Sequence, residues 1–183
     1  MFRGRREERR EERAAAGQAG GPTRYQMRQR LVSIGDDFNI ENDRGERAFH
    51  VDGKALRLRS TLIFQDPMGN ELCKIQERVA RVKDTMAIER PGGETLATVK
   101  KALITPVRER WTVKVGAGPD LEIQGNILDH EYVMEADRRR VAEVSKKWFR
   151  VADTYGVEVE PGQNDVVILA ATVAVDMMAS PGR

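Results

Sequence analysis

The side chains best suited to acid–base or metal chemistry fall in one run, Asp129-His130-Glu131-Tyr132. Carboxylate, imidazole and phenol groups are those that proton transfer and metal binding use. Neighbouring residues of a strand point to opposite faces, so these four side chains converge only if the chain bends sharply there. We therefore interpret the run as a turn or strand entry in which Asp129 bonds backbone groups. The second histidine, His50, follows Phe49 in a strand-like stretch and is interpreted as structural.

No other part of the chain adds a catalytic signature. The HExxH, GxSxG and Walker A patterns do not occur. Gly116 and Gly118 are interpreted as a hairpin turn, because the third glycine of a dinucleotide-binding loop and its helix are missing. Cys73 has no assignable base and is interpreted as a passive, half-buried thiol. We predict a non-enzymatic protein with no catalytic residue, cofactor or metal.

Basic residues form short clusters that could contact an anionic membrane surface. Each cation close to such a surface contributes about 1 kcal/mol. The alternative is an ordinary solvated exterior, because glutamates interleave with many of the clusters. The residues that we single out as possible anionic-lipid contacts are Arg57, Arg59, Lys100, Lys101, Lys146 and Lys147.

Charge separates a tail from a domain. Residues 1–23 contain six arginines and four glutamates, followed by alanine and glycine, and are predicted to be disordered. Residues 24–183 hold 25 basic and 25 acidic residues, and such a neutral domain is not expected to bind nucleic acid. One cysteine and the lack of a leader sequence or transmembrane segment favour a cytoplasmic protein, or one peripheral at a membrane.

The domain shows the period-two alternation of half-buried strands, for example in Val113-Lys114-Val115. Turn glycines recur every 24 residues, and so do the apolar residues six positions after them, which predicts repeated hairpin units. Isolated hairpins are barely stable and exposed sheet edges aggregate, so we expect the units to close into a barrel. A β-sandwich with coincidental spacing is the alternative. The repeated positions are Gly45, Gly69 and Gly93, with Val51, Ile75, Val99 and Ile123.

The segment Val166–Ala179 differs, since only Thr172 and Asp176 in it are polar. Its length and alanines predict a helix, and its uniform apolarity predicts that the helix is buried inside the barrel. A buried strand is the alternative, because valines are frequent. An anion near a helix C-terminus is unfavourable, so Asp176 is predicted to be a structural clamp, paired with an arginine or lysine at the barrel rim. A polar site inside the barrel is the functional alternative. The residues assigned a structural role here are Val166, Ile168, Leu169, Val173 and Asp176.

Taken in order, several segments resemble the LURP-one-related family of the Tubby C-terminal-like superfamily. The likeness covers roughly residues 24–179 and is strongest at Ile123–Tyr132. Further segments that carry it include Tyr25–Leu31, Gly69–Leu72, Leu96–Lys101 and Val141–Trp148.

The resemblance implies an all-β fold: a twelve-stranded antiparallel barrel that encloses the hydrophobic C-terminal helix. Tubby and scramblase-like relatives associate with membrane phospholipids. The resemblance therefore implies a non-enzymatic module that binds phospholipid headgroups or membrane surfaces. The alternative is a soluble scaffold or regulatory protein that binds another protein.

Overall fold

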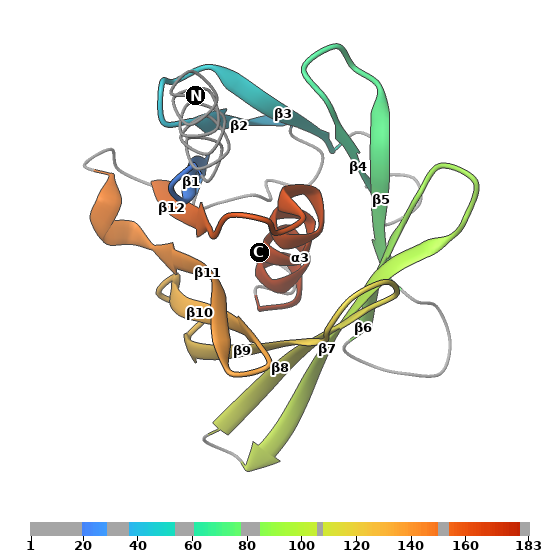
Figure 1. Ribbon diagram of the computed structural model, residues 1–183. Helices are drawn as coiled ribbons and strands as arrows, with labels where there is room; N and C mark the ends of the chain where they lie inside the picture. Colours follow the sequence, from blue (N-terminus) through green and yellow to red (C-terminus); the bar gives the residue numbers. More distant parts are fainter. Residues whose placement is uncertain are drawn as a thin grey trace, which may run out of the picture.

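The computed structural model describes residues 20–28, 37–53, 61–77, 85–105, 108–149 and 154–179. Twelve antiparallel strands close into one barrel, and helix α3 (Asp165–Ala179) lies inside it, as Figure 1 shows. Each strand pairs with the next along the chain, and β1 completes the ring by pairing with β12 as well as β2. The strands are β1 (Thr23–Arg28), β2 (Phe38–Asn42), β3 (Arg47–Asp52), β4 (Thr61–Gln65), β5 (Glu71–Glu77), β6 (Thr85–Glu89), β7 (Thr95–Thr105), β8 (Arg108–Val115), β9 (Leu121–Asn126), β10 (Glu131–Ala136), β11 (Arg139–Ser145) and β12 (Thr154–Val159), with a short 3-10 helix, η1 (Lys146–Trp148), before β12.

The closed barrel confirms the predicted fold class, and the sandwich alternative is wrong. Closure matters physically because it leaves no unpaired strand edge among these twelve strands. Most of the predicted tail, residues 1–19, lies outside the described residues, while Thr23, the last residue assigned to that tail, already belongs to β1.

The 24-residue repeat is structural. Gly45, Gly69 and Gly93 all adopt positive φ angles of 74°, 89° and 93° in the turns that join β2 to β3, β4 to β5 and β6 to β7. Glycine takes this conformation without the steric cost that a side chain brings. In each turn the glycine N–H donates to a carbonyl three residues earlier, at 3.0, 3.0 and 2.9 Å.

A β-bulge accompanies each of these turns at the same spacing, and its extra residue, Ala48, Leu72 or Leu96, lies on the strand that follows the turn. The pairing register shifts after Ile40, Phe64 and Ile88, which are 24 residues apart. A bulge bends its strand and increases the local twist, and both effects help a sheet to curve into a barrel. The apolar residues that follow the turns at the repeat spacing point inward, and Val51, Ile75, Val99 and Ile123 are all buried.

Because the strands alternate in direction, every second connection lies at the same end of the barrel. The glycine turns, the β8–β9 and β10–β11 turns and the start of α3 share one end, which we call the glycine-turn end. The β9–β10 turn at residues 127–130 lies at the other, which we call the His130 end. The connection from β3 to β4 and η1 join strands at this end too. Helix α3 runs from the glycine-turn end to the His130 end.

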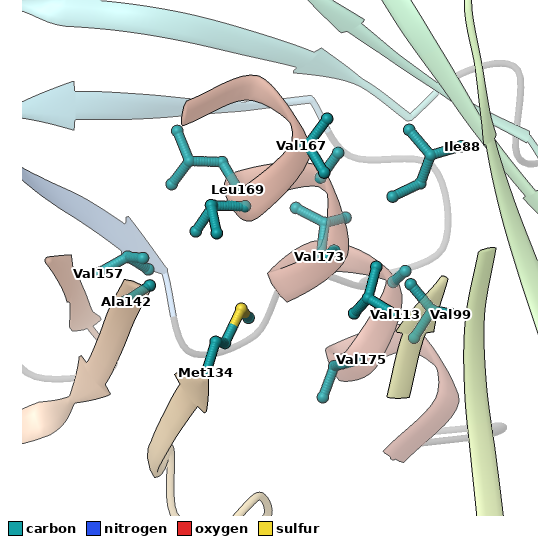
Figure 2. Close-up of a cluster of buried hydrophobic side chains, with 14 of the residues drawn as sticks. Ile88, Val99, Val113, Met134, Ala142, Val157, Val167, Leu169, Val173 and Val175 are labelled. Atoms are coloured by element: carbon teal, nitrogen blue, oxygen red, sulfur yellow. The ribbon is translucent and has the colours of Figure 1, made fainter. Parts of the chain in front are cut away.

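Helix α3 fills the barrel with aliphatic side chains. Figure 2 shows Val167, Leu169, Val173 and Val175 of the helix among inward-facing side chains of β6, β7, β8, β10, β11 and β12. All residues from 167 to 176 are buried. Ile168, Leu169 and Val173 are buried, whereas Val166 at the entry is half-buried. The helical prediction is confirmed and the buried-strand alternative is wrong.

The start of α3 is fixed by two side chains. The Asn164 side-chain oxygen accepts a hydrogen bond of 3.2 Å from the backbone N–H of Val167, as an N-cap residue does. The hydroxyl of Tyr25, on β1, donates to the carboxylate of Asp165, the first helical residue. An acidic residue in the first turn is also favourable to the helix dipole. The helix is therefore held at the point where it enters the barrel.

Candidate functional site

A polar cluster surrounds the other end of α3, inside the barrel. Asp176 is 8% exposed, and its Oδ2 accepts a hydrogen bond of 2.5 Å from the hydroxyl of Tyr155 on β12. Its Oδ1 lies 3.2 Å from Nε2 of His130. The imidazole of His130 stacks on the ring of Tyr155, with centroids 4.3 Å apart and planes inclined by 28°. Both carboxylate oxygens therefore have a partner, as a buried carboxylate requires.

His130 reaches the cluster because the chain bends there. Its φ angle is 54°, a left-handed conformation in which histidine is enriched but still uncommon. The backbone N–H of His130 donates to the carbonyl of Ile127 at 3.1 Å, which closes the turn. Asn126 and Asp129 bond each other across it through Nδ2 to Oδ2 at 2.7 Å. The predicted turn is thus present, although Asp129 bonds the Asn126 side chain with its carboxylate rather than backbone groups.

The four residues of the candidate cluster separate as strand geometry requires. His130 and Tyr132 are buried, whereas Asp129 is exposed and Glu131 is half-buried. Nδ1 of His130 is buried in this interior without a hydrogen-bond partner among the described residues, whereas the buried Tyr132 hydroxyl faces Thr172. Burial, followed by the charge of Asp176, raises the pKa of both Tyr132 and Tyr155 well above the ordinary value.

The predicted basic partner of Asp176 is wrong, because its described partners are His130 and Tyr155. The physical reason is desolvation: a second permanently charged group inside the barrel would have to leave water, whereas a phenol and an imidazole donate hydrogen bonds at lower cost. The signal in the sequence was the presence of His130 and Tyr155 themselves. Both residues are far from Asp176 along the chain, so the contact could not be predicted before the fold was known. The barrel brings the end of β9, β12 and α3 together.

This arrangement is suited to holding the helix rather than to chemistry. The carboxylate already accepts from two partners, and the surrounding interior is filled by α3. Among the residues that the structure describes, no group of three or more His, Cys, Asp or Glu side chains could hold a metal ion.

Cys73 is fully buried rather than half-buried. Burial, followed by the charge of Glu71, raises the pKa of its thiol to about 12, so the thiol stays protonated and unreactive. His50 bonds Asn39 through Nδ1 at 2.9 Å.

The lysine pair Lys146 and Lys147 lies in η1, directly after β11 at the His130 end. The Lys147 ammonium is 3.2 Å from Glu131 Oε2, and the same carboxylate accepts from Ser145 Oγ at 3.0 Å and from the backbone N–H of Lys146 at 3.1 Å. Partial desolvation opposes ionisation of Glu131, but these hydrogen bonds outweigh it and lower its pKa. Glu131 therefore ties the lysine pair to the start of β10.

Lys100 and Lys101 point to opposite sides of β7. Lys100 is exposed and pairs in register with Thr85, the residue at which β6 begins. The Lys101 ammonium lies 5.3 Å from the ring centroid of the buried Trp111, in the position of a cation–π contact. Arg57 and Arg59 lie outside the described residues, in the connection between β3 and β4.

Of the six predicted cations, Lys146 and Lys147 lie at the His130 end, whereas Lys100 and Lys101 lie midway along β7. Elsewhere on the exterior, some cations contact carboxylates. Arg24 contacts Glu158 at 2.7 Å, and Arg140 contacts Glu160 at 2.8 Å as well as Glu143.

A closed twelve-stranded barrel around one apolar helix, with no described metal cluster and with charged groups on its wall, defines a class of protein: the helix-filled barrel of the Tubby C-terminal-like type. The family model for LURP-one-related proteins matches residues 23–176. The chain belongs to the LURP-one-related family, which confirms the resemblance found in the sequence.

Two relatives agree with this assignment. The chain is 24% identical over 152 residues to the uncharacterized protein YxjI of Bacillus subtilis (strain 168), covering 83% of this chain and 91% of that protein. It is also similar in structure to an Arabidopsis thaliana protein solved by X-ray methods, with a TM-score of 0.67, 21% sequence identity, and coverage of 88% of this chain and 94% of that one. The structural likeness concerns the fold. Among the described residues, no helix is long and apolar enough to cross a membrane.

Proposed function

We propose that this protein is a non-enzymatic binding module that contacts anionic phospholipid headgroups reversibly through the His130 end of its barrel. The observation that carries the proposal is the lysine pair Lys146 and Lys147, which η1 holds at the His130 end. The Lys147 side chain is 79% exposed, and the exposed Lys100 lies midway along β7. Several cations close to a membrane surface, each contributing about 1 kcal/mol, suffice for reversible binding.

The interior of the barrel supports the same conclusion by a different route. Because α3 fills the lumen with aliphatic side chains, the exterior is where a partner of this fold is expected to bind. The salt bridge between Lys147 and Glu131 is exposed and weak, so a phosphate oxygen can compete for the ammonium group.

Co-sedimentation with vesicles tests the proposal. We expect the full chain to sediment with phosphatidylcholine vesicles that contain phosphatidylserine, to remain in solution with phosphatidylcholine alone, and to be released by salt. The double variant Lys146→Gln/Lys147→Gln should bind roughly tenfold or more weakly, as the loss of two cations implies. The matched control is Arg138→Gln/Arg139→Gln, which removes two exposed arginines at the glycine-turn end. Failure to sediment at low salt, or an equal effect of both double variants, would contradict the proposal.

A second candidate function, a scaffold that binds another protein, has its own support in the paired exterior charges. Arg24, Arg140 and Lys114 each contact a carboxylate, so much of the described wall offers alternating rather than uniformly positive charge. Such patterns suit a protein partner of complementary charge. Retention of one defined partner by the full chain, together with indifference to anionic vesicles, would favour this function.

A further inference from the structure

Leu128 is an exposed apolar side chain at the end of the barrel to which we assign lipid binding. Among the described residues two large hydrophobic side chains are strongly exposed, Leu128 at 68% and Met68 at 85%. They lie at opposite ends: Leu128 in the β9–β10 turn at the His130 end, and Met68 in the β4–β5 turn at the glycine-turn end. Single exposed apolar residues are common on protein surfaces, so exposure alone does not decide between them.

The turn that carries Leu128 is braced from within the barrel. Ile127, before it, is 7% exposed, and His130, two residues after it, is 8% exposed and contacts Asp176. One buried residue lies on each side of Leu128, and the Leu128 side chain is directed away from the core. The left-handed conformation of His130 and its stacking on Tyr155 add to this constraint. Such bracing lowers the conformational-entropy cost of ordering the turn on binding.

The same turn is tied on its outer side to the lysine pair. Glu131 follows His130 directly and bonds both the Lys147 ammonium and the backbone N–H of Lys146. Leu128 and the two lysines therefore belong to one connected surface, in which a carboxylate joins the turn to η1. The turn of Met68 is held differently: Asp66 and Asn70 bond each other at 2.7 Å, and one cation, Arg47, donates to the Pro67 carbonyl at 2.7 Å.

We infer that Leu128 is the apolar anchor of the membrane contact, entering the headgroup and acyl-chain boundary of an anionic bilayer while Lys146 and Lys147 meet the phosphates around it. Lysine stems lie along apolar surface and keep their ammonium groups in the polar layer, and apolar burial adds to electrostatic attraction in interfacial binding. This inference rests on the proposed function and extends it to a named contact.

An environment-sensitive label tests the anchor directly. Cys73 is fully buried, so a Leu128→Cys variant of the full chain can be labelled at position 128 with a thiol-reactive nitrobenzoxadiazole dye. Met68→Cys is the matched control at the other end. We expect the fluorescence of the label at position 128 to rise severalfold on addition of phosphatidylserine-containing vesicles, and that of the label at position 68 to stay unchanged. Equal responses at the two positions, or none at position 128 while the wild type sediments, would overturn the anchor.

A sedimentation assay with unlabelled variants separates the anchor from the proposed function. Leu128→Gln removes apolar surface without adding charge and should weaken binding about tenfold or more, whereas Met68→Gln should leave binding unchanged. Both side chains are exposed, so both variants should keep the unfolding temperature of the wild type. If Leu128→Gln sediments like the wild type, the anchor is refuted and the lysine contact stands. If the wild type itself stays in solution, the proposed function is refuted together with the anchor.

Discussion

Tyr155 donates a hydrogen bond to Asp176 at 2.5 Å, and this contact joins the wall of the barrel to the far end of the helix inside it. A matching contact exists at the near end, where Tyr25 donates to Asp165. Tyr25 and Tyr155 lie on β1 and β12, which pair to close the barrel. Two tyrosines of neighbouring strands thus bind two acidic residues of α3 and fix both its depth and its rotation. A helix that is apolar all round has little else to fix its rotation.

Removal of the Tyr155 hydroxyl should weaken the fold measurably. Tyr155→Phe keeps the ring that stacks on His130 but leaves one oxygen of the buried Asp176 without its donor, and a hydrogen bond to a buried charged group contributes about 1.5–3 kcal/mol. We expect a loss of that size in the free energy of unfolding, measured by urea denaturation. Tyr25→Phe is the comparison; its partner Asp165 is half-buried and open to water, so its loss should be smaller. Equal stability of Tyr155→Phe and wild type would show that the contact does not hold the helix.

Alkaline pH should unfold the protein and ionise its tyrosines in one step. The chain has three tyrosines, and burial, reinforced by a neighbouring aspartate, raises the pKa of all three above the ordinary 10.0. A group with a raised pKa in the folded state contributes stability that is complete below the unfolded pKa and is lost as the pH rises above it. Stability should therefore begin to fall near pH 9.0, where an unfolded Cys73 ionises, and fall more steeply above 10.0. Tyrosinate absorbance and circular dichroism should change together; absorbance that rises while the native spectrum persists would contradict the burial of these rings.

Gly125→Ala should be the most damaging glycine substitution tested. Gly125 has a φ of 133°, and a Cβ atom there would lie 2.5 Å from the carbonyl oxygen of Glu131 and 2.6 Å from Cα of Tyr132. Both atoms belong to the backbone of β10 and cannot move away without opening the β9–β10 pairing. We expect a loss of about 3 kcal/mol or more in thermal or urea unfolding. Gly69→Ala has the same backbone disadvantage but open space around its Cβ, and should cost about 1–2 kcal/mol. Similar losses in the two variants would show that the destabilisation of Gly125→Ala comes from the strained φ angle rather than from the close approach of β10.

The thiol of Cys73 should react only after unfolding. It is fully buried in β5, and its pKa of about 12 leaves negligible thiolate at neutral pH. We expect Ellman's reagent to modify the native chain no faster than the protein unfolds, and to modify the urea-unfolded chain at once. The Leu128→Cys variant provides the reactive reference in the native state. Rapid modification of the native wild type would contradict the inert role assigned to this cysteine.

Most of the fold could be predicted from the sequence, because the fold repeats one local pattern. Turn glycines and inward apolar residues at 24-residue spacing specify hairpins, and the uniform apolarity of Val166–Ala179 specifies a buried helix. What the pattern did not reveal were the bulges at Ala48, Leu72 and Leu96. A bulge changes one pairing and leaves no distinctive residue type, so it can be recognised only in the paired sheet.

The candidate site likewise has features that the sequence predicts and features that only the tertiary structure shows. That Asp176 needs a partner could be deduced from its apolar neighbours, because a buried carboxylate must be hydrogen-bonded. Only the fold identifies His130 and Tyr155 as these partners, because the barrel brings together a turn, a strand and a helix end that are far apart in the sequence. The side to which Leu128 points, and its link to Lys146 and Lys147 through Glu131, likewise follow from the three-dimensional path of the turn. Local spacing determined which elements form, because propensity and periodicity act between near neighbours in the chain. Tertiary closure determined which side chains meet, because hydrogen bonds act between neighbours in space.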